Sequence, residues 1–554
     1  MNDSADSSRD DLVSASKWMA LGTIISRITG FARAFLIVSA IGQKLNGDIF
    51  DTANSIPNAL YILVAGGVFN VVLVPQLVRA MKNDEDGGDA YANRVVTLGL
   101  LVLSTATVLL ILLVPLMVRV LFGHDFFTSA FADQKSSALL LMALCMPQVF
   151  FYGAFVLVGQ ILNARGRFGP MMWAPILNNI VSCAMVGVYI VAFGTSRSAD
   201  GFSTKESLVL GIGSTAGIAL QAIILVPYLR RAGFHYRPRF DFRGVGLGHT
   251  FRLGMWTLLF IIVNQIAFVT ITRIANNANV EAAKSGGGGG GSSAYNFGFL
   301  ISQVPHGIIT VSLATAMMPT LSALASDKLF PRMRLELGRT LRLTLVIVTP
   351  LAIAVACLGQ QLALVATSFG ANKGHTATLG HTIQGFAPAM VFFTVHYVML
   401  RGFYATENTR TPFFVQAILS ASNIGFAFAL SSLVDPINVS TMLALSFGAA
   451  YFVGSVFSAT LLSRVIGPVF DSEMWRFVVR MLAACAVAAA IMLAAAYTID
   501  SLLIDKATYA GAALAVFGGG VLGAGGFVLA AKAMRLEELS YLVDTLLRRR
   551  AAPQ

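Results

Sequence analysis

Apolar stretches long enough to cross a lipid bilayer recur along the whole chain, and they decide what it can fold into. A membrane-spanning helix needs about 20 apolar residues, and we count about fourteen such stretches. Hydrophobic residues make up 56% of the 554 residues and charged residues only 12%. The pattern predicts an all-α integral membrane protein and excludes a β-barrel, whose strands would alternate over short segments. The expected spans are 13–42, 48–79, 93–121, 136–163, 170–194, 206–229, 250–276, 294–323, 341–366, 381–405, 412–434, 440–464, 475–499 and 508–532.

Two proline-centred motifs indicate an internal duplication. The segment SIPNALYILVAGG around Pro57 resembles QVPHGIITVSLAT around Pro305, and the segments around Pro170 and Pro412 also resemble each other. The first six and the next six spans therefore look like parallel copies of one unit, as in transporters that alternate access around a central site. The alternative is that any helical bundle carries prolines at loop edges. We expect an N-terminal tail at 1–12, an N-lobe at 13–231, a basic linker at 232–249, a C-lobe at 250–464, two further spans within 465–532, and an amphipathic basic tail at 533–554.

The basic residues favour a membrane protein with both termini in the cytoplasm. The net charge is +12, but Lys and Arg cluster in short loops between apolar stretches. This positive-inside pattern sets orientation and gives no reason to expect a nucleic-acid partner. The segment 330–342 is predicted to be a basic amphipathic helix lying at the cytoplasmic interface. The glycine-rich segment 285–293 is predicted to be a flexible connector in an outside loop, and whether it is native to the chain stays open.

Charged residues at the first two spans are the strongest functional signal. Arg27 and Arg33 lie inside the first span, and Asp48 and Asp51 open the second. A charge near the bilayer centre costs roughly 2.5–3.5 kcal/mol, so it needs water, a partner or a ligand. Two guanidinium forks suit a phosphate or diphosphate, which each can hold with two parallel hydrogen bonds. The alternative is that both arginines snorkel to the interfaces or pair with the aspartates. Arg273, in the seventh span, is a further candidate, either facing the arginines of the first span or snorkelling at the outer end.

No catalytic or metal-binding signature is present in the sequence. It contains no Walker motif, no H-E-x-x-H and no G-x-S-x-G, and its four cysteines show no metal-ligand spacing. We therefore expect a membrane transporter rather than an enzyme, with no catalytic residue, no bound metal and no cofactor.

Several motifs together resemble the lipid II flippase family MurJ (MviN). They are SRITGFAR at 26–33, the spacing D-x8-P-N from Asp48 to Asn58, GGVFNVVLVPQL at 66–77, ILNARGRFGPMMWAP at 161–175 and FYATENTRTPF at 403–413. The resemblance covers roughly residues 15–530. It implies the fold of the multidrug/oligosaccharidyl-lipid/polysaccharide exporter superfamily, with two six-helix lobes and two extra helices. It also implies the function of moving a lipid-linked peptidoglycan precursor from the inner to the outer leaflet.

Only some of the functional residues that the resemblance implies are present in this sequence. Arg27, Arg33 and Asp48 match positions where the family has functional charges, and Asn58 and Gln303 are secondary candidates. Tyr61 and Leu300 stand where many members have arginine, and Gln303 stands where they have glutamate. The hypothesis that follows is that Arg273 supplies the missing charge of the C-lobe.

The resulting prediction is a lipid II flippase of the inner membrane that alternates access without ATP. An inside-negative potential favours outward passage of an anion by about 2.3 kcal/mol per charge per 100 mV. Lipid II and membrane lipids are the expected partners, and cell-wall synthesis or division proteins are candidate partners. The alternatives are an exporter of another polyprenyl-linked glycan or of drugs, and a non-transporting scaffold for cell-wall enzymes. Coupling to Na⁺ or H⁺, the resting conformation, the oligomeric state, the peptide of the substrate and a truncated C-terminal domain stay open.

Overall fold

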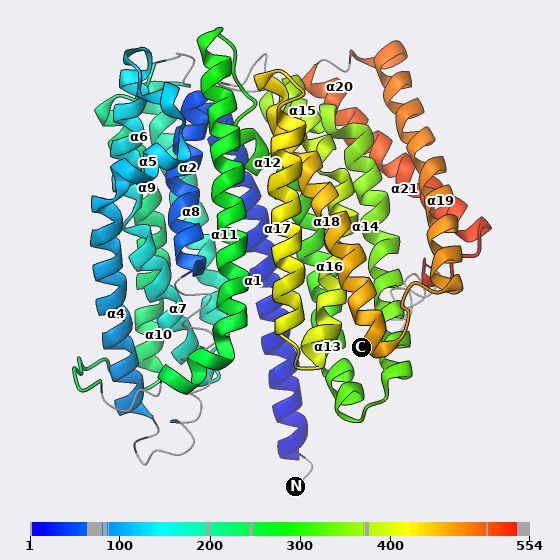
Figure 1. The fold of residues 1–554 in the computed structure, drawn as a ribbon, viewed down its shortest axis with the longest axis horizontal. Coiled ribbons are helices and arrows are strands. Elements are labelled where there is room, and N and C mark those ends of the chain that lie inside the picture. The colour runs from blue at the N-terminus through cyan, green and yellow to red at the C-terminus, as the bar shows by residue number, and fades with distance from the viewer. Residues whose placement is uncertain are drawn as a thin grey trace. The chain divides into compact units, whose positions relative to one another are not determined.

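The computed structural model describes residues 3–63, 80, 86, 88–195, 200–242, 247–368, 371, 376–505 and 508–539. Side chains are described within these ranges except at 3–20, 247–254, 502 and 503. The described segments are helices joined by short connections, and no β-strand occurs among them (Figure 1). Thirteen of the described helices are long and apolar enough to cross a membrane, which confirms the predicted class. The predicted span 48–79 is described only as far as residue 63, because 64–79 lie outside the described residues.

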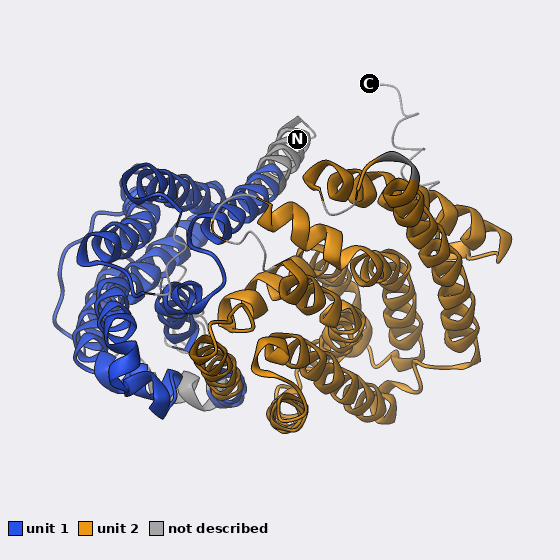
Figure 2. Ribbon diagram, turned by 90° about the horizontal axis from the view of Figure 1, so that it is seen from above, with its two compact units in different colours: residues 1–265 blue, residues 266–554 orange. Residues whose placement is uncertain are grey.

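The chain divides into two compact units, residues 1–265 and 266–554 (Figure 2). The boundary falls inside one continuous helix, α11, rather than in the basic stretch that precedes it. The first unit contains α1 (Asp3–Ile41), α2 (Leu45–Tyr61), α4 (Asp89–Leu112), α5 (Val114–Leu121), α6 (Ala132–Cys145), α7 (Gln148–Ala164), α8 (Gly169–Phe193), α9 (Thr204–Ile223), α10 (Leu225–Arg231) and the start of α11 (Leu247–Lys284). The second contains the end of α11, α12 (Ser292–Pro305), α13 (Val311–Ser326), α14 (Phe330–Thr367), α15 (Thr376–Gly385), α16 (Ala387–Ala405), α17 (Arg410–Ser431), α18 (Val439–Ile466), α19 (Ser472–Thr498), α20 (Tyr509–Leu514) and α21 (Gly520–Ala533).

The two units repeat the same scheme of helix packing. In the first unit α8 packs on α9, α7 packs on α4, and α6 packs on both α2 and α9. In the second unit α17 packs on α18, α16 packs on α14, and α15 packs on both α12 and α18. Pro147 interrupts the span made by α6 and α7, and Pro388 lies at the same point of the span made by α15 and α16. A proline removes one backbone donor and breaks the helical ladder, so equivalent breaks in equivalent spans are what an internal duplication produces. The helices α19 to α21 follow the second copy, as expected for the two extra spans.

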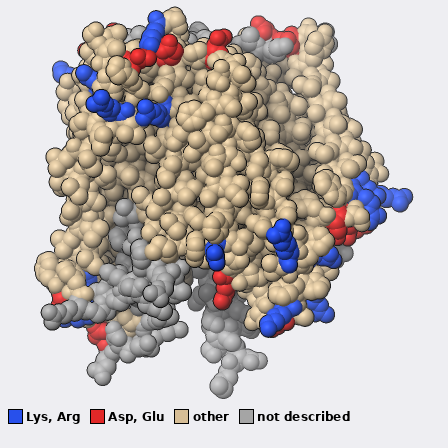
Figure 3. Space-filling model, viewed as in Figure 1, with Lys and Arg blue, Asp and Glu red and all other residues tan. Residues whose placement is uncertain are grey.

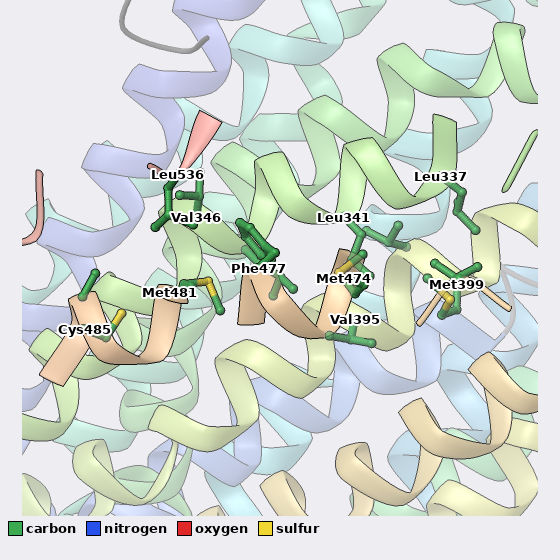
Figure 4. Packing of buried hydrophobic residues seen from close by; sticks show 14 of the residues in the cluster. Leu337, Leu341, Val346, Val395, Met399, Met474, Phe477, Met481, Cys485 and Leu536 are labelled. Atoms are coloured by element: carbon green, nitrogen blue, oxygen red, sulfur yellow. The ribbon is translucent and has the colours of Figure 1, made fainter. Parts of the chain in front are cut away.

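The segment 330–342 is helical as predicted, but it continues without a break into the 38-residue helix α14, and its apolar face does not point away from the protein as the prediction required. Met333, Leu337 and Leu341 are fully buried in a cluster with residues of α16 and α19. Figure 4 shows Leu337 and Leu341 in this cluster. These apolar residues recur every four positions, which places them on one face of the helix. The basic residues between them occupy the remaining faces, so the apolar face of the segment packs against protein.

The segment after α21 folds back onto α14. Leu536 is only 2% exposed and belongs to the same apolar cluster (Figure 4). Arg342 of α14 forms ion pairs with Glu473 of α19 and with Glu538, each at 2.8 Å. The predicted basic tail at 533–554 is therefore packed against the second unit as far as residue 539, and 540–554 lie outside the described residues.

The glycine-rich segment 285–293 is not the flexible connector that its composition predicts. Residues 288–293 are buried, and the Gly289 amide donates a 2.9 Å hydrogen bond to Asn279 Oδ1. A Cβ atom on Gly290 would lie 2.4 Å from the backbone oxygen of Ile437. Gly289 has a φ of 105°, a value that other residues rarely adopt. The run is thus a packed turn that requires glycine for close approach and for backbone conformation.

The described part of the basic linker, residues 232–242, lies along α4. The Arg237 amide donates to Asn93 Oδ1 at 2.6 Å, and the Arg239 amide donates to Thr97 Oγ1 at 3.0 Å. The Arg94 guanidinium of α4 donates to Asp241 at 2.8 Å, which lowers the pKa of that carboxyl from its ordinary value. The linker is therefore attached to the first unit through both backbone and side-chain contacts.

Charged side chains are separated by a broad band without charge. On the face drawn in Figure 3, the Lys, Arg, Asp and Glu residues shown in colour gather toward two opposite edges, and the described surface between them is almost entirely uncharged. A lipid-facing surface has this character because a charge in the hydrocarbon region is costly.

Candidate functional site

Arg27 and Arg33 lie on α1, which packs against α8. The Asn179 side chain of α8 donates 3.0 Å hydrogen bonds to the Ser26 carbonyl and to Thr29 Oγ1, so it fixes α1 between the two arginines. Arg27 is exposed, whereas Arg33 is half-buried. The Arg33 Nε atom is buried and has no hydrogen-bond partner among the described residues. The two arginines thus occupy different environments, and the more buried one retains an unused donor.

Arg33 lies within electrostatic range of polar side chains on two other helices. It is close enough to the Tyr152 hydroxyl of α7 and the Cys183 thiol of α8 to interact with both electrostatically. The Tyr152 ring stacks on the Tyr61 ring of α2, with centroids 5.1 Å apart. We call Arg33, Tyr61, Tyr152 and Cys183 the Arg33 cluster. Tyr152 connects the predicted arginine to Tyr61, the residue that stands where many family members have a second arginine.

A neighbouring hydrogen-bond network extends this polar interior. The Asn54 side-chain oxygen of α2 accepts from Gln148 Nε2 at 3.2 Å and from Cys145 Sγ at 3.9 Å. Cys145 also interacts electrostatically with Tyr152, which connects the network to the Arg33 cluster. The interior of the first unit therefore contains amides, hydroxyls and one arginine where a helical bundle could have packed aliphatic side chains.

The acidic candidate of α2 is deeply buried. Asp48 is 0% exposed in the first turn of α2, while Asp51 is half-buried. A carboxylate in the first turn interacts favourably with the helix dipole, and buried charges are hydrogen-bonded or paired. Asn58, on the same helix, is exposed.

The predicted residues of the second unit are less enclosed. Arg273 is exposed on α11. Gln303 is half-buried near the end of α12, and its backbone carbonyl accepts from the His306 amide. A π-helical turn at His306–Thr310 follows directly, and such turns are frequent at functional sites.

The sequence-based selection missed Arg401 of α16. This arginine is half-buried, donates from Nη2 to the Tyr397 hydroxyl, and lies over the Tyr397 ring at 4.4 Å. The signal was available, because Arg401 falls inside the apolar stretch 381–405 just as Arg27 and Arg33 fall inside the first span. No cluster of three or more His, Cys, Asp or Glu side chains suited to a metal ion occurs among the described residues.

Comparison with known proteins decides the family. A family model described as "Lipid II flippase MurJ" matches residues 37–510. The chain belongs to the MurJ family. That match begins after Arg27 and Arg33 and includes Asp48, Asn58, Arg273 and Gln303. The "Probable lipid II flippase MurJ" of Haemophilus influenzae is 28% identical over 420 residues, which cover 73% of this chain and 78% of the relative. The protein of the same description from Rhizobium tropici is 26% identical, covering 79% of each chain.

Solved structures show the same fold in the MurJ family and in a wider group of transporters. The structure titled "Lipid II flippase MurJ, inward closed conformation" matches with a TM-score of 0.69 at 19% identity, covering 91% of this chain and 97% of that one. An inward-facing multidrug resistance MATE family transporter of the MOP superfamily matches with a TM-score of 0.63 at 13% identity, covering 79% and 95%. The expected superfamily fold is thereby confirmed for this member of the MurJ family.

Proposed function

We propose that this chain translocates lipid II from the inner to the outer leaflet of the cytoplasmic membrane by alternating access, with both termini in the cytoplasm. Its membership of the MurJ family supports the substrate class, since the relatives are described as probable lipid II flippases. The observation that carries the proposal is the Arg33 cluster. A half-buried guanidinium with an unused Nε–H donor, placed among neutral polar groups, suits an anionic group that enters from outside the protein.

In this proposal the diphosphate of lipid II is the anion, and the polyprenyl tail stays in the bilayer. Arg33 binds the diphosphate within the first unit, and the more exposed Arg27 makes the first contact with it. Asp48 positions a guanidinium or contributes to a gate, and Arg273 supplies a positive charge from the second unit. Translocation of an anion outward gains about 2.3 kcal/mol per charge per 100 mV of inside-negative potential, so the scheme needs no ATP.

A drug exporter is the rival with the most similar fold, given the match to a MATE family transporter. A site for cationic drugs would favour acidic side chains in its interior. The Arg33 cluster instead offers a cation, two tyrosines and a thiol, and these groups favour an anionic substrate.

The experiment is leaflet exchange of labelled lipid II in liposomes that contain the purified protein. We expect exchange by the wild type and a roughly 10- to 100-fold slower rate for Arg33→Ala, because a hydrogen bond to a charged group contributes about 1.5–3 kcal/mol. Arg27→Ala should also slow exchange. Arg119→Ala is the matched control, since Arg119 is exposed in the last turn of α5, a helix that contributes no residue to the Arg33 cluster.

Two results would refute the proposal. One is a wild-type protein that is folded in liposomes and leaves lipid II in its original leaflet. The other is an Arg33→Ala variant that exchanges lipid II at the wild-type rate with equal amounts of protein. The first result would favour the scaffold alternative, and the second would remove the diphosphate role of the Arg33 cluster. Repeating the assay with an imposed potential and with Na⁺ or pH gradients tests the driving force.

A further inference from the structure

We propose that the second unit contains a binding site for a lipid phosphate group, formed by Arg401 of α16 between Tyr397 and Tyr404. The proposal rests on the function above only for the identity of the lipid. The chemistry of the site comes from the second unit alone.

The first argument is the state of the Arg401 guanidinium. It sits inside an apolar span and is half-buried, yet none of the ion pairs found among the described residues includes it. Its Nε atom is buried and has no hydrogen-bond partner within the described ranges. Arginine side chains stay charged under physiological conditions, and a buried charge without an opposite charge is costly. The site is therefore electrostatically incomplete.

The second argument is the arrangement of the aromatic rings. The guanidinium carbon lies 4.4 Å from the Tyr397 ring centroid and 5.9 Å from that of Tyr404. Cation–π contacts stabilise the charge without neutralising it. The Tyr397 hydroxyl accepts one N–H, so it orients the guanidinium and leaves other donors for a ligand. An oxyanion with several acceptor oxygens matches that remaining fork, and phosphate has this geometry.

The third argument is that neighbouring side chains pack against the site and position Tyr397. Tyr397 packs edge-on against His306, with centroids 4.8 Å apart, in the π-helical turn of the neighbouring span. The hydroxyls of Thr310 in the same turn and Thr394 on α16 are 3.2 Å apart and hydrogen-bonded. Pre-organised donors bind an anion at lower entropic cost than mobile ones.

Two lipids could supply the phosphate, namely the diphosphate lipid that the protein carries and an anionic phospholipid of the bilayer. The experiment measures binding of each to the purified full-length protein in zwitterionic detergent by native mass spectrometry. The probes are undecaprenyl diphosphate and phosphatidylglycerol. The variants are Arg401→Gln, Arg401→Lys and Tyr397→Phe. The control is Arg480→Gln, which removes an exposed arginine of α19.

We expect Arg401→Gln to weaken binding of at least one probe by roughly 10- to 100-fold, because it removes charge-assisted hydrogen bonds. Tyr397→Phe should weaken binding of that probe several-fold, and Arg401→Lys should retain part of the affinity. Loss for undecaprenyl diphosphate assigns the site to the transported lipid, and loss for phosphatidylglycerol alone assigns it to the bilayer. Wild-type affinity for both probes in Arg401→Gln would overturn the proposal.

Thermal unfolding separates loss of binding from loss of folding, and the leaflet-exchange assay separates failure of this site from failure of the proposed function. Thermal unfolding of each variant shows whether it is folded. If Arg401→Gln is not folded, Tyr397→Phe and Arg401→Lys test the site instead. Wild-type affinity for both probes in these two variants would then refute the proposed phosphate site. A protein that exchanges lipid II between leaflets while Arg401→Gln binds both probes normally would overturn this inference and leave the proposed function standing.

Discussion

Substituting Gly290 by alanine tests whether the glycine-rich segment is packed or flexible. In the structure a Cβ at this position would lie 2.4 Å from the Ile437 oxygen and 2.8 Å from the Pro436 oxygen. A carbon and an oxygen in van der Waals contact are about 3.3 Å apart, so one backbone must move by nearly 1 Å. Both atoms belong to backbone and cannot rotate away as a side chain would. Overpacking of this kind costs about 1–3 kcal/mol.

The assay is thermal unfolding of the purified protein in detergent. For domains of 150–250 residues, 1 kcal/mol corresponds to about 2–4 °C, so Gly290→Ala should lower the Tm of the second unit by a few degrees. Gly425→Ala on α17 is the matched control. No heavy atom lies within 4 Å of its new Cβ, so it should leave Tm unchanged or raise it slightly. Equal Tm values for Gly290→Ala and the wild type would refute the packed turn and restore the flexible connector.

Two further predictions concern the first part of α14 and the basic linker. Leu337→Ala should lower the free energy of unfolding by about 2–5 kcal/mol in denaturant unfolding, because the Leu337 side chain is fully buried. Leu335→Ala is the control and should have little effect, because Leu335 is exposed. Equal effects of the two substitutions would contradict the packing of this helix face against protein. The hydrogen bond from Arg94 lowers the pKa of Asp241 below its ordinary value of 3.8. The ionised carboxylate therefore stabilises docking of the linker at every pH above 3.8. This stabilisation is lost as the pH falls through the lowered pKa, where the carboxyl becomes protonated. Protection of the Arg239 amide from hydrogen exchange should therefore be constant from about pH 7 to 5 and decline below about pH 3.8. Asp241→Asn should remove this decline, because the variant has no carboxyl to protonate. An identical pH profile in the variant would contradict the docking contact.

Much of the fold could be predicted from sequence because bilayer thickness fixes the length of an apolar helix. Several spans begin and end close to their predicted positions, such as 170–194, which is observed as Gly169–Phe193, whereas α14 begins eleven residues before its predicted start at 341. The segment 330–342 failed because alternating basic and apolar residues look the same whether the apolar face meets lipid or protein. The burial of Leu337 and Leu341 depends on α16 and α19, which are distant in the sequence. The prediction for the glycine-rich segment failed because composition reveals neither the backbone φ angles nor the close contact with the Ile437 backbone.

The candidate site could be predicted only in part. The cost of an intramembrane charge singled out Arg33, and the structure places it among polar side chains. Which neutral residues surround it could not be predicted, because Tyr61 and Tyr152 come together through the packing of α2 on α7. The same cost should have singled out Arg401, which lies inside the apolar stretch 381–405. The roles of Arg27, Asp48, Asn58, Arg273 and Gln303 stay predictions.

The ion pairs of Arg342 have a practical consequence for anyone who adds a tag or shortens the chain. The residues that follow α21 contribute Leu536 to the apolar cluster and Glu538 to Arg342. A reporter fused directly after Ala533 would replace both and leave Arg342 with only one carboxylate. Fusions placed beyond Leu539 preserve the contacts of Leu536 and Glu538. Loss of expression in a shorter version would therefore reflect a destabilised second unit rather than the loss of a targeting sequence.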